Sequence, residues 1–315
     1  MITLKKPFLI ALDWGSTRFR GWLLDPNGIE IDKIDKEFGI LKINHSQYLD
    51  VFEKQLGSWI KQHGSIPIIA AGMIGSRHGW METPYLNCPT GLEQLAQNLS
   101  YLKINSKLIN SPLSMAIVPG IQYFENGIPD VMRGEETQIA GLELSQQQVD
   151  LCILPGTHSK WVFTNKGKIE SFTTFMTGEI FSIIQKNSIL NRLMVGKSFN
   201  KDEFITGCNQ SLNSSFGFLK EVFSARTMAI FDKINPKGIH SYLSGIVIGN
   251  EIKDGLENYY KNTSFEENAI VLNGEYSLCS LYRLAFETAG VKVKLEKKNL
   301  VAKGLFQIAQ KALLN

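Results

Sequence analysis

The chain has 315 residues, a length that suggests roughly two domains. Its 43% hydrophobic and 20% charged residues are the proportions of an ordinary globular protein. The net charge of +3 is too small to indicate a nucleic-acid partner or an anionic membrane surface.

A turn of small residues follows the first predicted strand. The apolar run 8–11 leads to Asp13, and Gly15, Ser16 and Thr17 come shortly after it, before the chain returns as a second strand. Gly15 allows close approach of the backbone to a ligand, and the hydroxyl groups beside exposed N–H groups could cradle a phosphate. Asp13 could face the same ligand through a magnesium ion and its waters. An ordinary hairpin, in which Asp13 and Ser16 satisfy the turn amides, is the alternative that this stretch leaves open.

The next segment predicts a helix, then a strand that leads into a polar loop. Apolar residues recur at helical spacing over 46–62, and a buried strand with a Gly-rich turn follows at 66–76. The loop at 77–85 combines Arg, His, Trp and Tyr side chains, which suits the wall of a ligand site. Arg77 and Trp80 are the candidates in this loop. A surface loop with anchoring aromatic residues is the alternative.

Two adjacent carboxylates stand at the start of a later helix. After an expected helix over 91–102 and a buried strand over 114–121, Arg133 and Gly134 precede Glu135 and Glu136, and a helical pattern follows. A pair of carboxylates beside Arg and Gly is a candidate for acid–base chemistry. The alternative is that both Glu residues only complement the positive end of the helix.

A second stretch repeats the plan of the first hairpin. A polar break at 145–148 marks the expected domain boundary. An apolar strand at 151–154 then runs into Gly156 and Thr157, and a strand leaves the turn after His158, near Lys160. This weak internal repeat of a strand–turn–strand–turn–strand unit indicates two phosphate hairpins. Two such hairpins across a cleft are typical of the actin, Hsp70 and sugar-kinase superfamily.

The last part of the chain predicts helices around one more strand. Residues 180–231 are mainly helical, and a helix over 240–256 carries small residues that include Gly245. Small residues allow a flat ligand to approach, or they allow close packing of helices. A strand at 268–272 ends in a turn at Gly274, and an amphipathic helix over 299–314 closes the chain.

Cysteine usage and the N-terminus indicate a cytoplasmic protein. The four cysteines are isolated, with no C-x-x-C pair, so we expect buried thiols and a reducing compartment. The N-terminal apolar run stops at Asp13, so we expect neither a signal peptide nor a membrane span. No G-x-G-x-x-G fingerprint is present, which disfavours a Rossmann oxidoreductase.

The order of these motifs resembles the 2-dehydro-3-deoxygalactonokinase family over essentially the whole chain. The segments that carry the resemblance are Ala-Leu-Asp-Trp-Gly-Ser-Thr at 11–17, Ala-Gly-Met-Ile-Gly-Ser at 71–76, Met-Arg-Gly-Glu-Glu-Thr-Gln at 132–138, Pro-Gly-Thr-His-Ser-Lys-Trp at 155–161 and Leu-Ser-Gly at 243–245. One departure is visible, because the adenosine turn has only Gly274 where the family usually has consecutive small residues.

The resemblance implies an α/β fold in which two actin-like (ribonuclease H-like) ATPase domains flank a nucleotide cleft. Residues 1–146 would form a sugar-acid and phosphate-binding domain, with the C-terminal helix 299–315 packing back on it, and residues 147–298 would bind the nucleotide. The implied activity is ATP-dependent phosphorylation of the 6-hydroxyl of 2-dehydro-3-deoxy-D-galactonate in galactonate or galactose catabolism. The alternatives are another carbohydrate kinase of this fold and, from a different class, an actin- or Hsp70-like ATPase.

The resemblance also implies roles for individual residues. Glu135 is the first candidate for the catalytic base, and Glu136 would orient it, bind a substrate hydroxyl or assist the metal. Asp13 would hold hydrated Mg²⁺. Arg77 is the candidate for the substrate carboxylate, with Trp80 and Arg133 as further substrate-binding candidates. The expected partners are a small sugar acid and ATP, with no nucleic acid or membrane, and a homodimer is an oligomeric state that we consider. The candidates for binding ATP are Gly15, Ser16, Thr17, Gly156, Thr157, His158, Lys160, Gly245 and Gly274.

Overall fold

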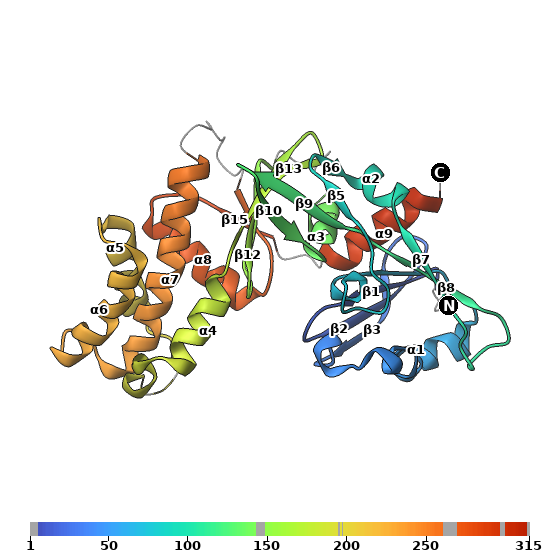
Figure 1. Cartoon of the computed structure of the whole chain (residues 1–315), viewed down its shortest axis with the longest axis horizontal. Helices are drawn as coiled ribbons and strands as arrows, with labels where there is room; N and C mark the ends of the chain where they lie inside the picture. Colours follow the sequence, from blue (N-terminus) through green and yellow to red (C-terminus); the bar gives the residue numbers. More distant parts are fainter. Residues whose placement is uncertain are drawn as a thin grey trace, which may run out of the picture. The chain divides into compact units, whose positions relative to one another are not determined.

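The computed structural model divides the chain into two compact units, which are described separately (Figure 1). Unit 1 comprises residues 1–148, 164–171 and 298–315, and unit 2 comprises residues 149–163 and 172–297. The predicted boundary at 145–148 and the ends of the predicted C-terminal helix lie outside the described residues. The structure describes residues 6–142, 149–194, 196, 198–260, 270–296 and 300–313.

A six-stranded mixed sheet forms the centre of unit 1. Its strand order is β3-β2-β1-β4-β8-β7, and β1 pairs antiparallel with β2 and parallel with β4. Nearly every residue of β1 is buried, because this strand lies inside the sheet with both faces covered. The strands are β1 (Leu9–Trp14), β2 (Phe19–Leu24), β3 (Glu30–Lys36), β4 (Ile68–Ala71), β7 (Ser100–Ile104) and β8 (Leu113–Ile117).

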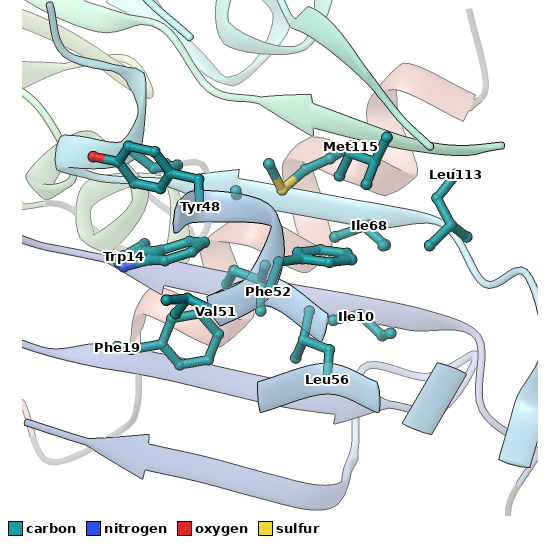
Figure 2. Close-up of a cluster of buried hydrophobic side chains, with 14 of the residues drawn as sticks. Ile10, Trp14, Phe19, Tyr48, Val51, Phe52, Leu56, Ile68, Leu113 and Met115 are labelled. Carbon is teal, nitrogen blue, oxygen red and sulfur yellow. The ribbon is translucent and has the colours of Figure 1, made fainter. Parts of the chain in front are cut away.

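Helix α1 (Tyr48–His63) covers one face of this sheet and builds the main core of unit 1. Figure 2 shows side chains of α1, among them Val51, Phe52 and Leu56, together with side chains from the strands. The apolar positions follow the helical period, so one face of α1 is buried while the other is polar. The helix predicted over 46–62 is therefore present.

A helical layer in unit 1 is built around α9 (Leu300–Leu313). This helix packs against α2 (Leu92–Gln97), α3 (Glu135–Gly141) and strands β1 and β4. Glycines let α3 and α9 approach closely: a Cβ at Gly304 would overlap the Thr137 carbonyl, and one at Gly141 would overlap the Leu300 carbonyl. Helix α9 therefore fixes the position of α3.

A second, smaller sheet in unit 1 has the strand order β10-β9-β5. Its strands are β5 (Tyr85–Asn87), β9 (Gly120–Glu125) and β10 (Ile128–Met132), and β10 leads directly toward α3. Short 3-10 turns complete the unit: η1 (Ile40–Lys42), η2 (His45–Gln47) and η3 (Met73–Gly75).

The helix predicted over 91–102 is wrong in its second half. Helix α2 ends at Gln97, and residues Ser100–Ile104 form β7, which pairs antiparallel with β8. The burial along β7 alternates, as expected for an edge strand with one face on the core. The pairing with β8 decides the conformation of this stretch, and residues nearby in sequence do not reveal it.

The sheet of unit 2 repeats the strand arrangement of unit 1. Strand β11 pairs antiparallel with β12 and parallel with β14, as β1 does with β2 and β4. The predicted strand–turn–strand–turn–strand repeat is therefore present. Residues 164–171 belong to unit 1, where Ile169 and Lys168 pair with β6 (Thr90–Gly91). The strands are β11 (Leu151–Leu154), β12 (Ser159–Asn165), β13 (Lys168–Phe175), β14 (Ile270–Leu272) and β15 (Lys294–Leu295).

Among the described residues of unit 2, five α-helices accompany the sheet. Helices α5 and α7 pack closely, since a Cβ at Gly207 would overlap the Tyr242 carbonyl and one at Gly245 would overlap the Phe204 carbonyl. No helix within the described residues is both long and apolar enough to span a bilayer. The helices are α4 (Thr177–Asn187), α5 (Lys201–Asn213), α6 (Phe218–Ile230), α7 (Ile239–Gly255) and α8 (Tyr276–Thr288), with shorter turns η4 (Ile189–Leu193), η5 (Pro236–Gly238) and the π-helical η6 (Leu256–Tyr260).

Candidate active site

Asp13 lies at the carboxyl end of β1, where parallel α/β sheets commonly bind ligands. Its side chain is 13% exposed and forms an ion pair with Arg20, its neighbour on β2. Burial raises the pKa of Asp13, and the Arg20 guanidinium opposes that shift. A Cβ at Gly72 would lie 3.1 Å from Asp13 Oδ1, so the turn after β4 comes directly against this carboxylate.

Residues that follow β3 form backbone hydrogen bonds to the turn after β1. The Gly15 N–H donates to the Arg18 carbonyl at 2.9 Å, which closes the turn. The N–H groups of Gly39 and Leu41 donate to the carbonyls of Thr17 and Ser16, respectively. Contact of the Ser16 and Thr17 N–H groups with a phosphate stays a prediction.

The start of α3 meets the same turn after β4. Gly134 has a φ of +116°, and a Cβ at this position would lie 3.3 Å from the Gly72 Cα. A side chain at Gly134 would therefore be strained and would crowd Gly72. Since Gly72 also borders Asp13, the ends of β1 and β4 and the start of α3 converge at one place in unit 1.

The two adjacent glutamates have different environments. Glu135 is partly exposed, and its Oε2 accepts a hydrogen bond from the Arg133 N–H at 3.1 Å. Glu136 is 0% exposed, and its Oε2 accepts from the Gly134 N–H at 2.7 Å. Burial, reinforced by the Glu135 charge, raises the pKa of Glu136 to about 8. Its Oε1 is buried with no hydrogen-bond partner among the described residues.

The buried Arg133 side chain contacts the segment before and within β5. Its guanidinium donates to the hydroxyl and, at 2.9 Å, to the carbonyl of Thr83. It also lies over the Tyr85 ring, 4.2 Å from the ring centroid. These contacts join β5 to the residue before Gly134. Contact of Arg133 with a substrate stays a prediction.

The two candidates in the 77–85 loop differ in exposure. Arg77 is exposed. Trp80 is half-buried and stacks on Tyr48 at 5.8 Å between ring centroids, with an interplanar angle of 11°. It also makes edge contacts with Trp14 and Phe52. Trp80 therefore anchors its loop in the aromatic core of unit 1, as the alternative interpretation of this loop anticipates.

In unit 2, the turn after β11 lies against the start of α4. A Cβ at Gly178 would overlap the Gly156 carbonyl, and the Glu179 N–H donates to the Thr157 carbonyl at 2.9 Å. The exposed His158 Nε2 lies 2.5 Å from the Glu179 carboxylate. The N-terminal end of an eleven-residue helix thus stands beside a glycine turn, an arrangement that favours anions.

The turn after β14 lies beside the turn after β11. Gly274 has a φ of +157°, and a Cβ there would lie 3.2 Å from the Pro155 carbonyl oxygen. The Asn273 N–H donates to the Ile153 carbonyl at 3.1 Å. The candidate phosphate turn and the candidate adenosine turn of unit 2 are therefore neighbours at the carboxyl ends of the adjacent strands β11 and β14.

Two other candidates for ATP binding face the interior of unit 2. The buried Lys160 ammonium group donates to the Thr174 hydroxyl at 2.6 Å and lies 5.9 Å from the Phe172 ring centroid. Gly245 packs on α5, so the close-packing alternative accounts for its small size. Contact of either residue with ATP stays a prediction.

Sequence reasoning missed a buried carboxylate near the turn after β11. Glu251 of α7 is 3% exposed and accepts hydrogen bonds from Ser159, Trp161 and Tyr282. A charged residue within the otherwise apolar buried face of this helix is the signal that could have revealed it.

A magnesium site at Asp13 would need few protein ligands. No cluster of three or more His, Cys, Asp or Glu side chains that could hold a metal occurs among the described residues. Mg²⁺ in phosphoryl-transfer sites keeps several waters and takes one or two carboxylates, with phosphate oxygens as further ligands. The partly buried Asp13 carboxylate, next to the phosphate-type turn, fits that kind of site.

The repeated sheet with a small-residue turn after the first strand of each unit is the fold of actin-like ATPases and sugar kinases. This fold is shared by the ligand-bound xylulose kinase of Lactobacillus acidophilus, with a TM-score of 0.56 at 11% identity over 98% of this chain and 90% of that chain. The predicted α/β fold class is confirmed.

Residues 13–308 match the family model described as 2-keto-3-deoxy-galactonokinase, and the chain belongs to this family. The 2-dehydro-3-deoxygalactonokinase of Escherichia coli (strain K12) is 29% identical over 284 residues, which are 90% of this chain and 91% of that protein. A crystal structure of a candidate 2-dehydro-3-deoxygalactonokinase from Sinorhizobium meliloti has a TM-score of 0.86 at 27% identity, over 97% of this chain and 99% of that chain. The chain is a kinase, that is, a phosphotransferase that uses ATP, as predicted.

Proposed function

We propose that this chain transfers the γ-phosphoryl group of ATP to the 6-hydroxyl of 2-dehydro-3-deoxy-D-galactonate, in galactonate or galactose catabolism in the cytoplasm. The observation that carries the proposal is the convergence of Asp13, Gly72 and the start of α3 in unit 1. Phosphoryl transfer depends on positioning and charge stabilisation, with a carboxylate available to accept the hydroxyl proton. The converging segments offer both an acid–base pair and a carboxylate for a metal.

Glu135 is the base in this proposal. A carboxyl group whose pKa is raised to about 8, as that of Glu136 is, carries a proton at neutral pH and is a poor proton acceptor. Glu135 is more exposed, and its carboxylate stands at the positive end of α3, which favours the charged form. Glu135 would take the proton of the 6-hydroxyl as the new P–O bond forms and ADP leaves. Glu136 would orient Glu135 or bind a hydroxyl group of the substrate.

The turn after β1 and Asp13 are assigned to the charged end of ATP. The N–H and hydroxyl groups of Ser16 and Thr17, with Gly15, would bind phosphate oxygens. Asp13 would hold Mg²⁺ through waters, and when bound the ion neutralises charge on the phosphates. The Arg20 partner keeps the Asp13 side chain in one orientation.

Unit 2 is assigned to the nucleotide. Gly156 and Thr157, at the N-terminal end of α4, would bind phosphate groups, and His158 would contribute a further polar contact. Gly274 would line the adenosine side, which is consistent with its place beside Pro155. Lys160 and Gly245 would support the ATP site from the interior of unit 2. Lys160 would do so through its hydrogen bond to Thr174, and Gly245 through its packing on α5.

The sugar acid is assigned to unit 1. The exposed Arg77 would pair with the substrate carboxylate in a bidentate geometry, which Arg suits better than Lys. Trp80 would position the loop that carries Arg77, since its ring is held by the aromatic core. Arg133 would hold Gly134 in place through β5 and would also contact the substrate.

The test is a coupled assay for ADP formation with a panel of substrates. The panel contains 2-dehydro-3-deoxy-D-galactonate, other aldonic and 2-dehydro-3-deoxy sugar acids, and neutral ketoses and polyols of similar size. We expect ADP formation with the first compound and little with the neutral compounds, because these lack the partner of Arg77. Preferred turnover of a neutral sugar would indicate another carbohydrate kinase, and ADP formation that ignores every acceptor would indicate an ATPase.

A further inference from the structure

A buried carboxylate on α7 has no part in the proposed reaction, yet both of its oxygens accept hydrogen bonds. Glu251 Oε1 accepts hydrogen bonds from the Ser159 hydroxyl at 2.6 Å and from the Trp161 indole N–H at 2.8 Å. Its Oε2 accepts one from the Tyr282 hydroxyl, and the Thr177 hydroxyl also donates to the carboxylate. The four donors come from β12, α4 and α8.

Two of these donors stand at the two sides of the candidate phosphate turn. Ser159 begins β12, directly after the turn, and Thr177 begins α4. The next residues of α4 contact the turn itself: Gly178 packs against it, and the Glu179 N–H donates to the Thr157 carbonyl at 2.9 Å. One carboxylate therefore holds both segments whose relative position shapes the turn.

Burying a charge of this kind is costly unless hydrogen bonds compensate it. Each carboxylate oxygen can accept two hydrogen bonds, so four donors match the capacity of Glu251. Burial raises the pKa of Glu251, whereas the donors favour its ionised form. A fully satisfied buried network of this kind rigidifies the elements that it joins.

We propose that Glu251 is a positioning residue for nucleotide binding, which holds the turn at Gly156 and Thr157 and the start of α4 in the geometry that receives the ATP phosphates. Glu251 itself contacts no substrate. This inference rests on the proposed function, because it takes this turn as the phosphate site of unit 2. It adds a residue that sequence patterns do not assign.

The experiment compares Glu251→Gln with the matched control Glu221→Gln. Glu221 is a carboxylate of α6 that is 1% exposed, and its Oε2 accepts from the Asn250 side chain at 2.6 Å. In both variants the size of the side chain is kept, while one acceptor oxygen becomes an NH₂ donor. At Glu251 that change leaves two of the four donors without their acceptor oxygen.

The readouts are the dissociation constants of ATP and ADP, measured by calorimetry on the intact protein in magnesium buffer, and the Tm. We expect Glu251→Gln to weaken nucleotide binding about tenfold or more. Glu221→Gln should lower Tm while the dissociation constants stay within about twofold of the wild type. A change in Tm alone at Glu251, or equal changes in affinity for both variants, would overturn the positioning role.

If Glu251→Gln does not fold, Ser159→Ala and Tyr282→Phe carry the test. Ser159→Ala removes the donor attached to the turn, and Tyr282→Phe removes the donor on α8. Positioning predicts a several-fold larger loss of nucleotide affinity for Ser159→Ala, and equal losses contradict it. Wild type that binds ATP but phosphorylates no sugar acid would overturn only the proposed substrate, whereas wild type that binds no nucleotide would overturn both proposals.

Discussion

At the scale of single residues, burial controls the charges of the candidate site. Asp13, Glu136 and Glu251 are all carboxyl groups whose pKa is raised by burial. They differ in the groups that lower the pKa again: the Arg20 ion pair at Asp13, backbone N–H groups at Glu136, and side-chain hydrogen-bond donors at Glu251. In the proposals above, this difference separates the metal-holding role of Asp13, the orienting role of a neutral Glu136 and the positioning role of Glu251.

Asp13→Asn should lower turnover by about 100-fold or more, with a much smaller change in ATP affinity, because the carboxylate acts on charge that develops during transfer. Steady-state kinetics at saturating Mg²⁺ measure this effect. Asp25→Asn is the control, since Asp25 is also buried but accepts from the N–H groups of Asn27 and Ile29 in its own turn. That variant should lose stability and keep its turnover. Unchanged turnover in Asp13→Asn would refute the assignment.

Glu135→Gln should lose most of the turnover at saturating ATP and sugar acid while both substrates still bind. An amide cannot accept the hydroxyl proton, so a loss of roughly 100- to 10,000-fold is expected for a general base. Glu136→Gln should lose less, because a Gln amide resembles the protonated carboxyl group in size and polarity. If Glu135→Gln stays active and Glu136→Gln does not, the two roles are exchanged. If both stay active, the base lies elsewhere.

The raised pKa of Glu136 predicts a pH dependence of stability. The folded protein retains this proton up to about pH 8, whereas the unfolded chain releases it near the ordinary value of 4.5. The stabilisation that this proton provides is therefore fully present below pH 4.5 and is lost as the pH rises through 8. Between these values the contribution falls by up to roughly 1.4 kcal/mol per pH unit.

Chemical denaturation between pH 5 and 8 tests this expectation, with wild type and Glu136→Gln measured in parallel. The variant cannot ionise, so its stability relative to wild type should rise with pH. Parallel curves for the two proteins would show that Glu136 titrates as it does in the unfolded chain.

At the scale of elements, glycines decide how closely helices approach. In unit 1 Gly141 and Gly304 join α3 to α9, and in unit 2 Gly207 and Gly245 join α5 to α7. A Cβ added at any of these four positions would overlap the backbone of the partner helix. That backbone cannot move unless the whole helix shifts. The first crossing matters for function, because α3 begins with Glu135 and Glu136.

Gly304→Ala should destabilise the protein by about 3 kcal/mol or more, because the new methyl group would overlap the Thr137 carbonyl in α3. It should also lower turnover in the protein that remains folded, since α3 must shift. The control is Gly217→Ala, where a Cβ meets nothing within 4 Å. Denaturation and single-temperature kinetics on both variants measure the two effects. A Gly304→Ala protein as stable as the control would contradict the packing of α3 on α9.

At the scale of the whole molecule, each unit has its own buried core. The core of unit 1 lies between α1 and its six-stranded sheet, and unit 2 has one cluster on its sheet and another among α4, α6 and α7. A unit with its own core can respond to a ligand by itself. The proposed roles assign the sugar acid to unit 1 and the nucleotide mainly to unit 2.

Hydrogen exchange with one ligand at a time tests this division of roles. ADP alone should slow exchange most in β11, β12 and the start of α4. The sugar acid alone should slow exchange most around 72–85 and at the start of α3. Bound ligand stabilises the segments that it contacts by mass action, so the protected peptides report the binding unit. Protection of the same peptides by both ligands would contradict the assignment.

Much of the fold was accessible from the sequence because it depends on local patterns. Apolar runs that end in Gly, Ser and Thr identify β1 and β11 with their turns, and helical periodicity identifies α1, α7 and α9. The repeat of one hairpin plan in both halves indicates the superfamily, and the motif order indicates the family. Each of these strands, turns and helices is identified by side chains within a few residues of one another, and the repeat and the motif order follow from comparing such local patterns along the chain.

Tertiary structure decided what depends on distant residues. Pairing with β8 makes residues Ser100–Ile104 a strand where the local pattern favours a helix. The backbone of α5 explains the small size of Gly245, and Thr83, fifty positions away in the sequence, engages Arg133. The four donors of Glu251 come from three other elements, and Gly72 brings Asp13 to the start of α3. No local propensity carries this information, because these contacts exist only once the sheets and helices have packed.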